Sequence, residues 1–127
     1  MRIMRNRRGF WKDEHGAGAA EFALVLLPFL ALIFGIIGLS TMFYANQTLH
    51  YATEAAARCF SVNVTSCATT GATQTYAATR YSGPDISPVF VATTAGCGHT
   101  VTGNANITLD VLVTSITVPL SATACYP

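Results

Sequence analysis

A long run without charge is the feature that most limits what this chain can fold into. No charged side chain occurs from Phe22 to Ala45, and a helix of that length measures about 36 Å at a rise of ~1.5 Å per residue. The hydrocarbon core of a bilayer is about 30 Å thick. A core helix of a soluble domain would be shorter and would carry polar residues along one face. The run therefore predicts a helix that crosses a membrane.

The charges on the two sides of this run are unequal. The residues before Gly16 include five basic and two acidic side chains, whereas those after Tyr44 include two basic and three acidic ones. Positively charged flanks stay in the cytoplasm. Residues 1–16 are therefore predicted to be a cytoplasmic leader, with the C-terminal part across the membrane. The basic residues adjoin an apolar run and no nucleic-acid-binding module, so nucleic acid is not an expected partner.

Four cysteines all lie on the predicted outer side, where the environment is oxidising. An even number of cysteines there favours two disulfides. Three pairings are open from the sequence. The pairing we favour joins Cys59 to Cys67 and Cys97 to Cys125, because the first bond would tie a helix end to the loop that follows. A metal site at Cys97 and His99 is the rival interpretation, but it lacks the paired C-x-x-C spacing of structural zinc sites.

One carboxylate, Glu21, stands directly before the apolar run. At this end of a span it costs less than the ~2.5–3.5 kcal/mol of a charge at the helix centre, but it still needs an explanation. An interfacial position is one explanation, since a negative charge in the first turn of a helix is favourable. The run is too long for the apolar part of a removable secretory signal, so we expect it to remain as an anchor.

The residues around Glu21 suggest a second explanation. A basic leader, a glycine, four small residues, a glutamate and a long apolar helix follow one another, and this arrangement resembles that of type IV prepilins. The resemblance implies that prepilin peptidase cuts after Gly16 and that Ala17 becomes the first residue of the mature chain. It also implies that Glu21, followed by Phe22, pairs with the free amino terminus of a neighbouring subunit during assembly.

A longer stretch, residues 9–60, resembles the TadE-like family of tight-adherence (Tad, or Flp) pilus systems. Members combine a small-residue stretch into Glu-Phe-Ala, an early proline in the apolar run, a Phe-Tyr-Ala segment and an Ala-rich helix ending in Ala-Arg. The matching residues are Ala19-Ala20-Glu21-Phe22-Ala23-Leu24-Val25, Pro28, Phe43-Tyr44-Ala45 and Ala55-Ala56-Ala57-Arg58.

This resemblance implies a minor pilin or pseudopilin that is required for assembling the Flp fibre. The implied location is the inner membrane, with a single pass and the C-terminal part in the periplasm, or within the pilus itself. The implied partners are other pilins and pseudopilins, prepilin peptidase, the inner-membrane assembly machinery and the lipid bilayer. The resemblance does not decide whether the chain is of the TadE or the TadF type. The alternative function is of a different class, that of a signal-anchored periplasmic binding or interaction protein unrelated to pili.

Small residues recur along one face of the predicted span. Ala31 and Gly35 form a small-xxx-small pair, and Gly38 falls on the same face. Such faces let helices approach closely, so we expect helix packing at these positions.

Beyond the membrane the helical pattern continues. Small and apolar residues recur at helical spacing at Ala45, Leu49, Ala52, Ala56 and Cys59. We therefore divide the chain into a leader (1–16), a transmembrane helix (17–45), a periplasmic continuation (46–60) and a small disulfide-bonded head (61–127).

The head is rich in Thr, Ser, Ala and Gly and poor in charge. "PVFVATT" (88–94) and "NITLDVLVTSITVPL" (106–120) are predicted strands, and residues 73–81 suit either a strand or a short helix. Gly83-Pro84 and Gly103-Asn104 are predicted turns, and Pro119 suits a strand end. The expected fold class is α+β: a long N-terminal helix followed by a small antiparallel β head, as in type IV pilins.

No catalytic motif is recognisable. The three histidines fall in the leader, the helix and the head, and the acids of the outer part are scattered over unlike segments. No serine or threonine stands in a motif that pairs it with a base. We therefore expect neither enzymatic activity nor a cofactor or metal ion.

Overall fold

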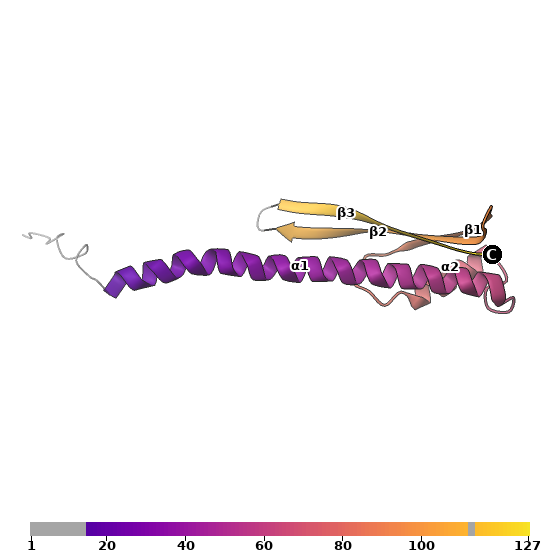
Figure 1. Cartoon of the computed structure of the whole chain (residues 1–127), viewed down its shortest axis with the longest axis horizontal. Helices are drawn as coiled ribbons and strands as arrows, with labels where there is room; N and C mark the ends of the chain where they lie inside the picture. Colours follow the sequence, from indigo (N-terminus) through magenta and orange to yellow (C-terminus); the bar gives the residue numbers. More distant parts are fainter. Residues whose placement is uncertain (1–14, 112–113) are drawn as a thin grey trace, which may run out of the picture. The chain divides into compact units, whose positions relative to one another are not determined.

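The structure, a computed structural model, describes residues 15–111 and 114–127. Two helices precede three strands: α1 (His15–Val62), α2 (Thr70–Arg80), β1 (Val89–Ala95), β2 (Gly98–Val111) and β3 (Thr114–Tyr126) (Figure 1). Residues 37–127 form one compact unit, and the described residues before them belong to another. The predicted α+β fold class is confirmed. The predicted leader lies outside the described residues, apart from its last two.

Helix α1 ends in a turn organised by Asn63. The Asn63 amide donates to the Cys59 carbonyl at 2.8 Å, and its side-chain Oδ1 accepts from the amides of Thr65 (3.1 Å) and Ser66 (3.0 Å). Asparagine favours such turns because its side chain satisfies nearby backbone amides. The turn reverses the chain and carries Cys67 back to α1.

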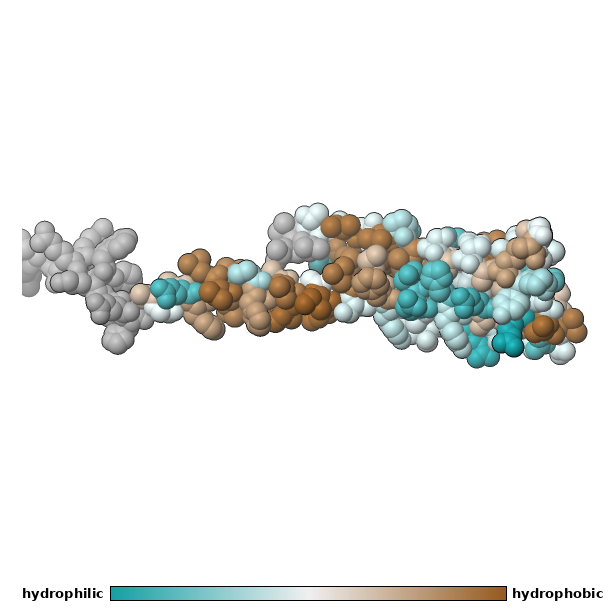
Figure 2. All heavy atoms as spheres, viewed as in Figure 1, coloured by the Kyte–Doolittle hydropathy of each residue, from teal (hydrophilic) through white to brown (hydrophobic). Residues whose placement is uncertain are grey.

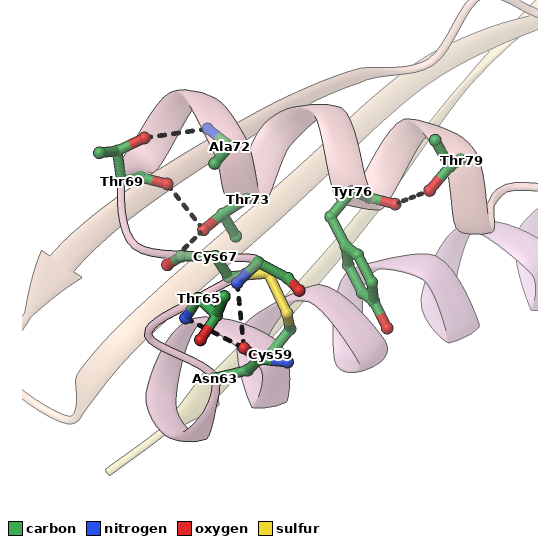
Figure 3. Close-up of a disulfide and its surroundings, with 10 residues drawn as sticks. Cys59, Asn63, Thr65, Cys67, Thr69, Ala72, Thr73, Tyr76 and Thr79 are labelled. Atoms are coloured by element: carbon green, nitrogen blue, oxygen red, sulfur yellow. Dashed lines mark hydrogen bonds between the residues drawn. A yellow bond between two sulfur atoms is a disulfide. The ribbon is translucent and has the colours of Figure 1, made fainter.

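A disulfide closes this turn. It joins Cys59 in the last turns of α1 to Cys67, with a Cα–Cα distance of 5.8 Å (Figure 3). Helix α2 then begins at an N-cap, where the Thr69 hydroxyl accepts from the Ala72 amide. A side-chain oxygen in this position satisfies an amide that has no partner within the helix. Residues 73–81, open between strand and helix from the sequence, are therefore almost entirely helical.

The sheet is antiparallel with the order β1-β2-β3. Strands β2 and β3 pair along their full length, from His99 opposite Tyr126 to Val111 opposite Thr114. A second disulfide joins Cys97, before β2, to Cys125 near the end of β3, and it closes a loop with a sequence separation of 28. Closing such a loop is worth about 3.5 kcal/mol in the chain-entropy account.

Three details of the sheet differ from the prediction. Gly103-Asn104 is no turn but lies within β2, opposite Phe90 and Val89 of β1. Residues 106–120 are not one strand, because β2 ends at Val111 and β3 begins at Thr114. Pro119 lies inside β3 rather than at its end. A proline is tolerated there because β3 is an edge strand, where an amide can be missing from the free side.

The core lies between one face of α1 and the sheet. All five residues predicted at helical spacing are buried, and the cluster around them contains Ala45, Leu49, Ala52, Ala56, Ala57, Ala77, Phe90, Ala92, Val101, Ile107, Leu120 and Ala122. Alanines dominate the α1 side of this cluster. The sequence-derived core face of the helix is therefore confirmed.

Tyr44 fastens the segment between α2 and β1 to α1, and Tyr81 closes a turn within that segment. The Tyr44 hydroxyl donates to the Ser82 carbonyl at 2.8 Å, and the Tyr81 hydroxyl donates to the Pro84 carbonyl at 2.8 Å. Burial raises the pKa of Tyr81, so its hydroxyl keeps the proton that it donates. A Cβ at Gly83 would collide with the hydroxyls of Thr48 and Tyr81, so this bend needs its glycine.

Gly103 gives the sharpest test of the core. A Cβ at this position would lie 2.9 Å from Cε1 of Phe90 and 3.1 Å from Cδ1 of Leu49. We expect Gly103→Ala to lower the free energy of unfolding by about 1–3 kcal/mol, as for other overpacked cores. Thermal unfolding of the detergent-solubilised protein, followed by near-ultraviolet circular dichroism, measures this change.

The matched control is Gly71→Ala in α2, where a Cβ meets nothing within 4 Å. It should leave the stability unchanged or raise it by up to about 1 kcal/mol, since alanine favours a helix more than glycine does. A Gly103→Ala protein as stable as the Gly71→Ala protein would contradict the close approach of α1 to the sheet.

Candidate functional site

The first part of α1 places its apolar side chains in the open. From Gly16 to Ile36 every residue is exposed except the half-buried Ile33, and the large side chains include Leu24 at 73% and Leu27 at 71% exposure. Figure 2 shows this part of the helix as an almost continuous run of apolar residues. Soluble monomers rarely expose apolar patches larger than a few hundred Å². The segment therefore requires lipid or a protein partner around it.

Helix α1 is long and apolar enough to cross a membrane, and its most apolar stretch is not buried within the described fold. Pro28 lies inside it without ending it. In a membrane helix the carbonyl freed by a proline is satisfied by neighbours.

The predicted processing site lies at the start of α1. Gly16 and Ala17 belong to its first turn and are exposed. A Cβ at Gly16 would meet nothing within 4 Å. Glycine costs a helix roughly 0.5–1 kcal/mol relative to alanine, and nothing in the described fold requires this glycine.

Glu21 lies in the second turn of α1, followed by Phe22 at 68% exposure. Its side chain is exposed, and within the described residues it forms no hydrogen bond or ion pair. The favourable effect of the helix dipole is concentrated in the first turn, so it contributes little to a carboxylate here. The described residues therefore give Glu21 no hydrogen-bonding or ion-pairing role.

The three small residues of the predicted packing face have different surroundings. Ala31 and Gly35 are exposed, and a Cβ at Gly35 would meet nothing within 4 Å. Gly38 is half-buried, and a Cβ there would lie 4.0 Å from Cδ2 of Leu109 in β2. Ala31 and Gly35 are thus open to another helix, whereas Gly38 already faces the hairpin of its own chain.

This contact between Gly38 and Leu109 is one that sequence reasoning missed. Met42, one turn further along α1, is also partly buried against the core. The alternation of apolar and polar residues in 106–111 was visible in the sequence. The strand register that places these residues beside the last turns of the predicted span could not be read from the sequence.

Both disulfides form in the structure with the pairing that the sequence favoured. Because Cys97 is bonded to Cys125, it is not available as a thiolate ligand for a metal. His99 instead packs its ring against Phe60 at 4.3 Å between centroids. Across residues 15–111 and 114–127, no three His, Cys, Asp or Glu side chains gather in a way that suits a metal ion.

Comparison with known proteins agrees with this segment of the chain. Residues 16–58, about a third of the sequence, match the family model described as TadE-like protein. The resemblance seen in the sequence is therefore confirmed for this segment. No curated protein and no solved structure matches the chain.

The exposed apolar part of α1 predicts a sharp response to charge. An arginine near the middle of a membrane span costs about 2.5–3.5 kcal/mol, or roughly 100-fold in the insertion equilibrium. We expect Phe29→Arg to move the protein from the membrane to the soluble or aggregated fraction, measured by alkaline extraction of membranes.

Tyr51→Arg is the matched control, because Phe29 and Tyr51 are both 58% exposed aromatic residues of α1. It should stay in the membrane fraction. Equal membrane fractions for the two variants would contradict a span around Phe29.

Proposed function

We propose that this chain, TadE-like over residues 16–58, is a minor pilin or pseudopilin required for assembling a Tad or Flp-type pilus. The observation that carries the proposal is an overlap between the family match and the uncovered apolar helix. The family match covers residues 16–58, beginning at the residue predicted to end the leader, and it contains the exposed apolar residues 16–36 of α1. The segment shared with the family therefore includes the part of the helix that the fold leaves uncovered.

The first step of the proposed mechanism is proteolytic. Prepilin peptidase cuts the bond between Gly16 and Ala17, which removes the basic leader and frees the Ala17 amine. A protease must approach the backbone closely at the cut, and a residue without a side chain permits this. Since the described fold has no need of Gly16, the requirement for glycine falls to the peptidase.

The second step is electrostatic. A carboxylate and an amine are each costly in a low-dielectric membrane or filament core, and pairing offsets part of that cost. Glu21, exposed and without a partner among residues 15–111 and 114–127, pairs with the Ala17 amine of a neighbouring subunit. This pair sets the register in which the apolar helices pack, with Ala31 and Gly35 allowing a close approach.

The proposed setting follows from these steps. The chain inserts in the inner membrane as a single pass, with the leader in the cytoplasm and the disulfide-bonded head in the periplasm. Its partners are other pilins and pseudopilins, the peptidase, the assembly machinery and the surrounding lipid. Its role is structural, and no step calls for enzymatic chemistry of its own.

Cutting should depend on Gly16. We expect Gly16→Leu to abolish removal of the leader, seen as retention of the full mass in peptidase-positive cells. Gly18→Leu, at a second glycine of α1 whose Cβ would also meet nothing within 4 Å, should still be trimmed. A Gly16→Leu protein cut as completely as the wild type would place the processing site elsewhere.

Assembly should depend on the charge of Glu21. We expect Glu21→Ala and Glu21→Gln to insert, to be trimmed and to unfold at the wild-type temperature, because the side chain has no partner in the part of the chain that the structure describes. Both should reduce piliation by at least about tenfold, the effect of losing ~1.4 kcal/mol at a subunit contact. Piliation is counted by electron microscopy of cells that carry the matching pilus genes.

The control is Glu54→Ala, which removes the other exposed carboxylate of α1. It lies in the head part of the helix and should leave the number of pili unchanged. Normal piliation with Glu21→Ala would overturn the proposed pairing.

A further inference from the structure

The far end of the β2–β3 hairpin has two unlike faces. In an antiparallel pair, residues directly opposite each other share a face. Leu109 lies opposite Ile116, and Ile107 lies opposite Val118. These four residues share the face that turns toward α1, since Ile107 belongs to the core and Val118 packs against it.

The other face of the same hairpin end is polar. It carries Thr108 opposite Thr117 and Asp110 opposite Ser115, and all four side chains are exposed. The hairpin end is therefore an amphipathic two-stranded element.

Helix α1 covers only part of the apolar face. Ile107 is 4% exposed, but Ile116 is 52% exposed although it lies on the same side of the sheet. Figure 2 shows apolar residues gathered over this end of the hairpin. An aliphatic side chain left open at a strand end next to α1 calls for an environment other than water.

One contact shows which residue of α1 the hairpin end lies beside. Leu109 approaches Gly38, with 4.0 Å between its Cδ2 and a Cβ built on the glycine, and Met42 is partly buried against the core one turn later. A hydrocarbon core of about 30 Å takes about 20 helical residues. A span that starts between Gly18 and Phe22 then ends between Ile37 and Thr41, within about one turn of Gly38.

We propose that the end of the β2–β3 hairpin is a second membrane contact, seated in the headgroup layer of the outer leaflet. The inference rests on the proposed membrane insertion of α1. Leu109 and Ile116 face the boundary between headgroups and acyl chains, continuing the lipid contact of the helix. Thr108, Asp110, Ser115 and Thr117 face water and headgroups.

The hairpin end cannot lie deeper than this layer. The free edge of β3 presents backbone amides and carbonyls without partners in the sheet, and hydrocarbon does not satisfy such groups. The exposed Asp110 carboxylate would also be costly there. The hairpin therefore marks where the hydrocarbon ends on α1, at about Gly38 rather than at Ala45.

This boundary changes the position of Glu21. About 20 residues before Gly38, the count needed for a full span, begin at Gly18. Glu21 then lies inside the cytoplasmic edge of the hydrocarbon by about one turn, and not among the headgroups. An unpaired carboxylate is more costly at that depth than among headgroups. This cost strengthens the case for the pairing proposed for Glu21.

Depth-dependent quenching of tryptophan fluorescence tests the inference. The native Trp11 is replaced by Phe, and a single indole is introduced as Ile116→Trp, Phe29→Trp or Thr123→Trp in the full chain. Each protein is reconstituted in phosphatidylethanolamine–phosphatidylglycerol vesicles that contain lipids with a nitroxide near the headgroup or near the end of the acyl chain. Ile116 tolerates the larger ring because it is half exposed, and Thr123 is an exposed residue at the opposite end of β3.

We expect the Ile116→Trp indole to be quenched at least about twofold more by the shallow nitroxide than by the deep one, as for interfacial elements. The Phe29→Trp indole should be quenched by the deep nitroxide, and the Thr123→Trp indole by neither. An Ile116→Trp indole as little quenched as the Thr123→Trp one would overturn the inference.

The remaining outcomes are equally distinct. A blue-shifted Ile116→Trp emission without lipid quenching would overturn the inference and assign the apolar face to a second copy of the chain. Strongest quenching by the deep nitroxide would overturn the headgroup placement. If the Phe29→Trp indole is also unquenched, the proposed membrane span itself fails. If the Phe29→Trp indole is quenched and the Ile116→Trp indole is not, only the hairpin contact is refuted.

Discussion

The removal of apolar surface from water is the constraint on which the rest of this structure depends. Helix α1 buries one face of its C-terminal part beneath the sheet, but its N-terminal part has no such cover. At roughly 25 cal/mol per Å², leaving that surface in water is prohibitive for an isolated chain. Lipid and neighbouring helices are the two environments that can cover it, and the proposed function uses both in succession.

The composition of α1 changes along its length according to what covers it. Leu, Ile and Phe dominate the exposed part, which the described residues leave uncovered, and alanine dominates the face that packs on the sheet. Gly16 and Glu21 fit neither requirement, since the described fold gives them neither a tight contact nor a partner. Residues that a fold does not explain are the natural candidates for recognition by another molecule, here a peptidase and a neighbouring subunit.

Local patterns in the sequence predicted much of this fold, and non-local register accounts for the rest. The apolar run, the core face of α1 from Ala45 to Cys59 and the α+β class follow from periodicity and length alone. Gly103 was predicted to lie in a turn because glycine is a common turn residue. Its glycine is instead explained by the Phe90 ring and the Leu49 side chain, which occupy the space that a Cβ would need, and this depends on tertiary packing. Pro119 was predicted at a strand end, but it lies inside β3, where the free edge of the strand tolerates a missing amide. The contact of Leu109 with Gly38 joins residues far apart in the sequence, and no local signal marks it.

The N-terminal sequence of the protein, purified from membranes of cells with and without prepilin peptidase, tests the central claim most directly. The account predicts that the mature chain begins at Ala17 in peptidase-positive cells and retains the leader in peptidase-negative cells. An intact leader in peptidase-positive cells that cut a known prepilin would contradict it. Glu21 would then have no freed amine to pair with, and the chain would be an anchored periplasmic protein.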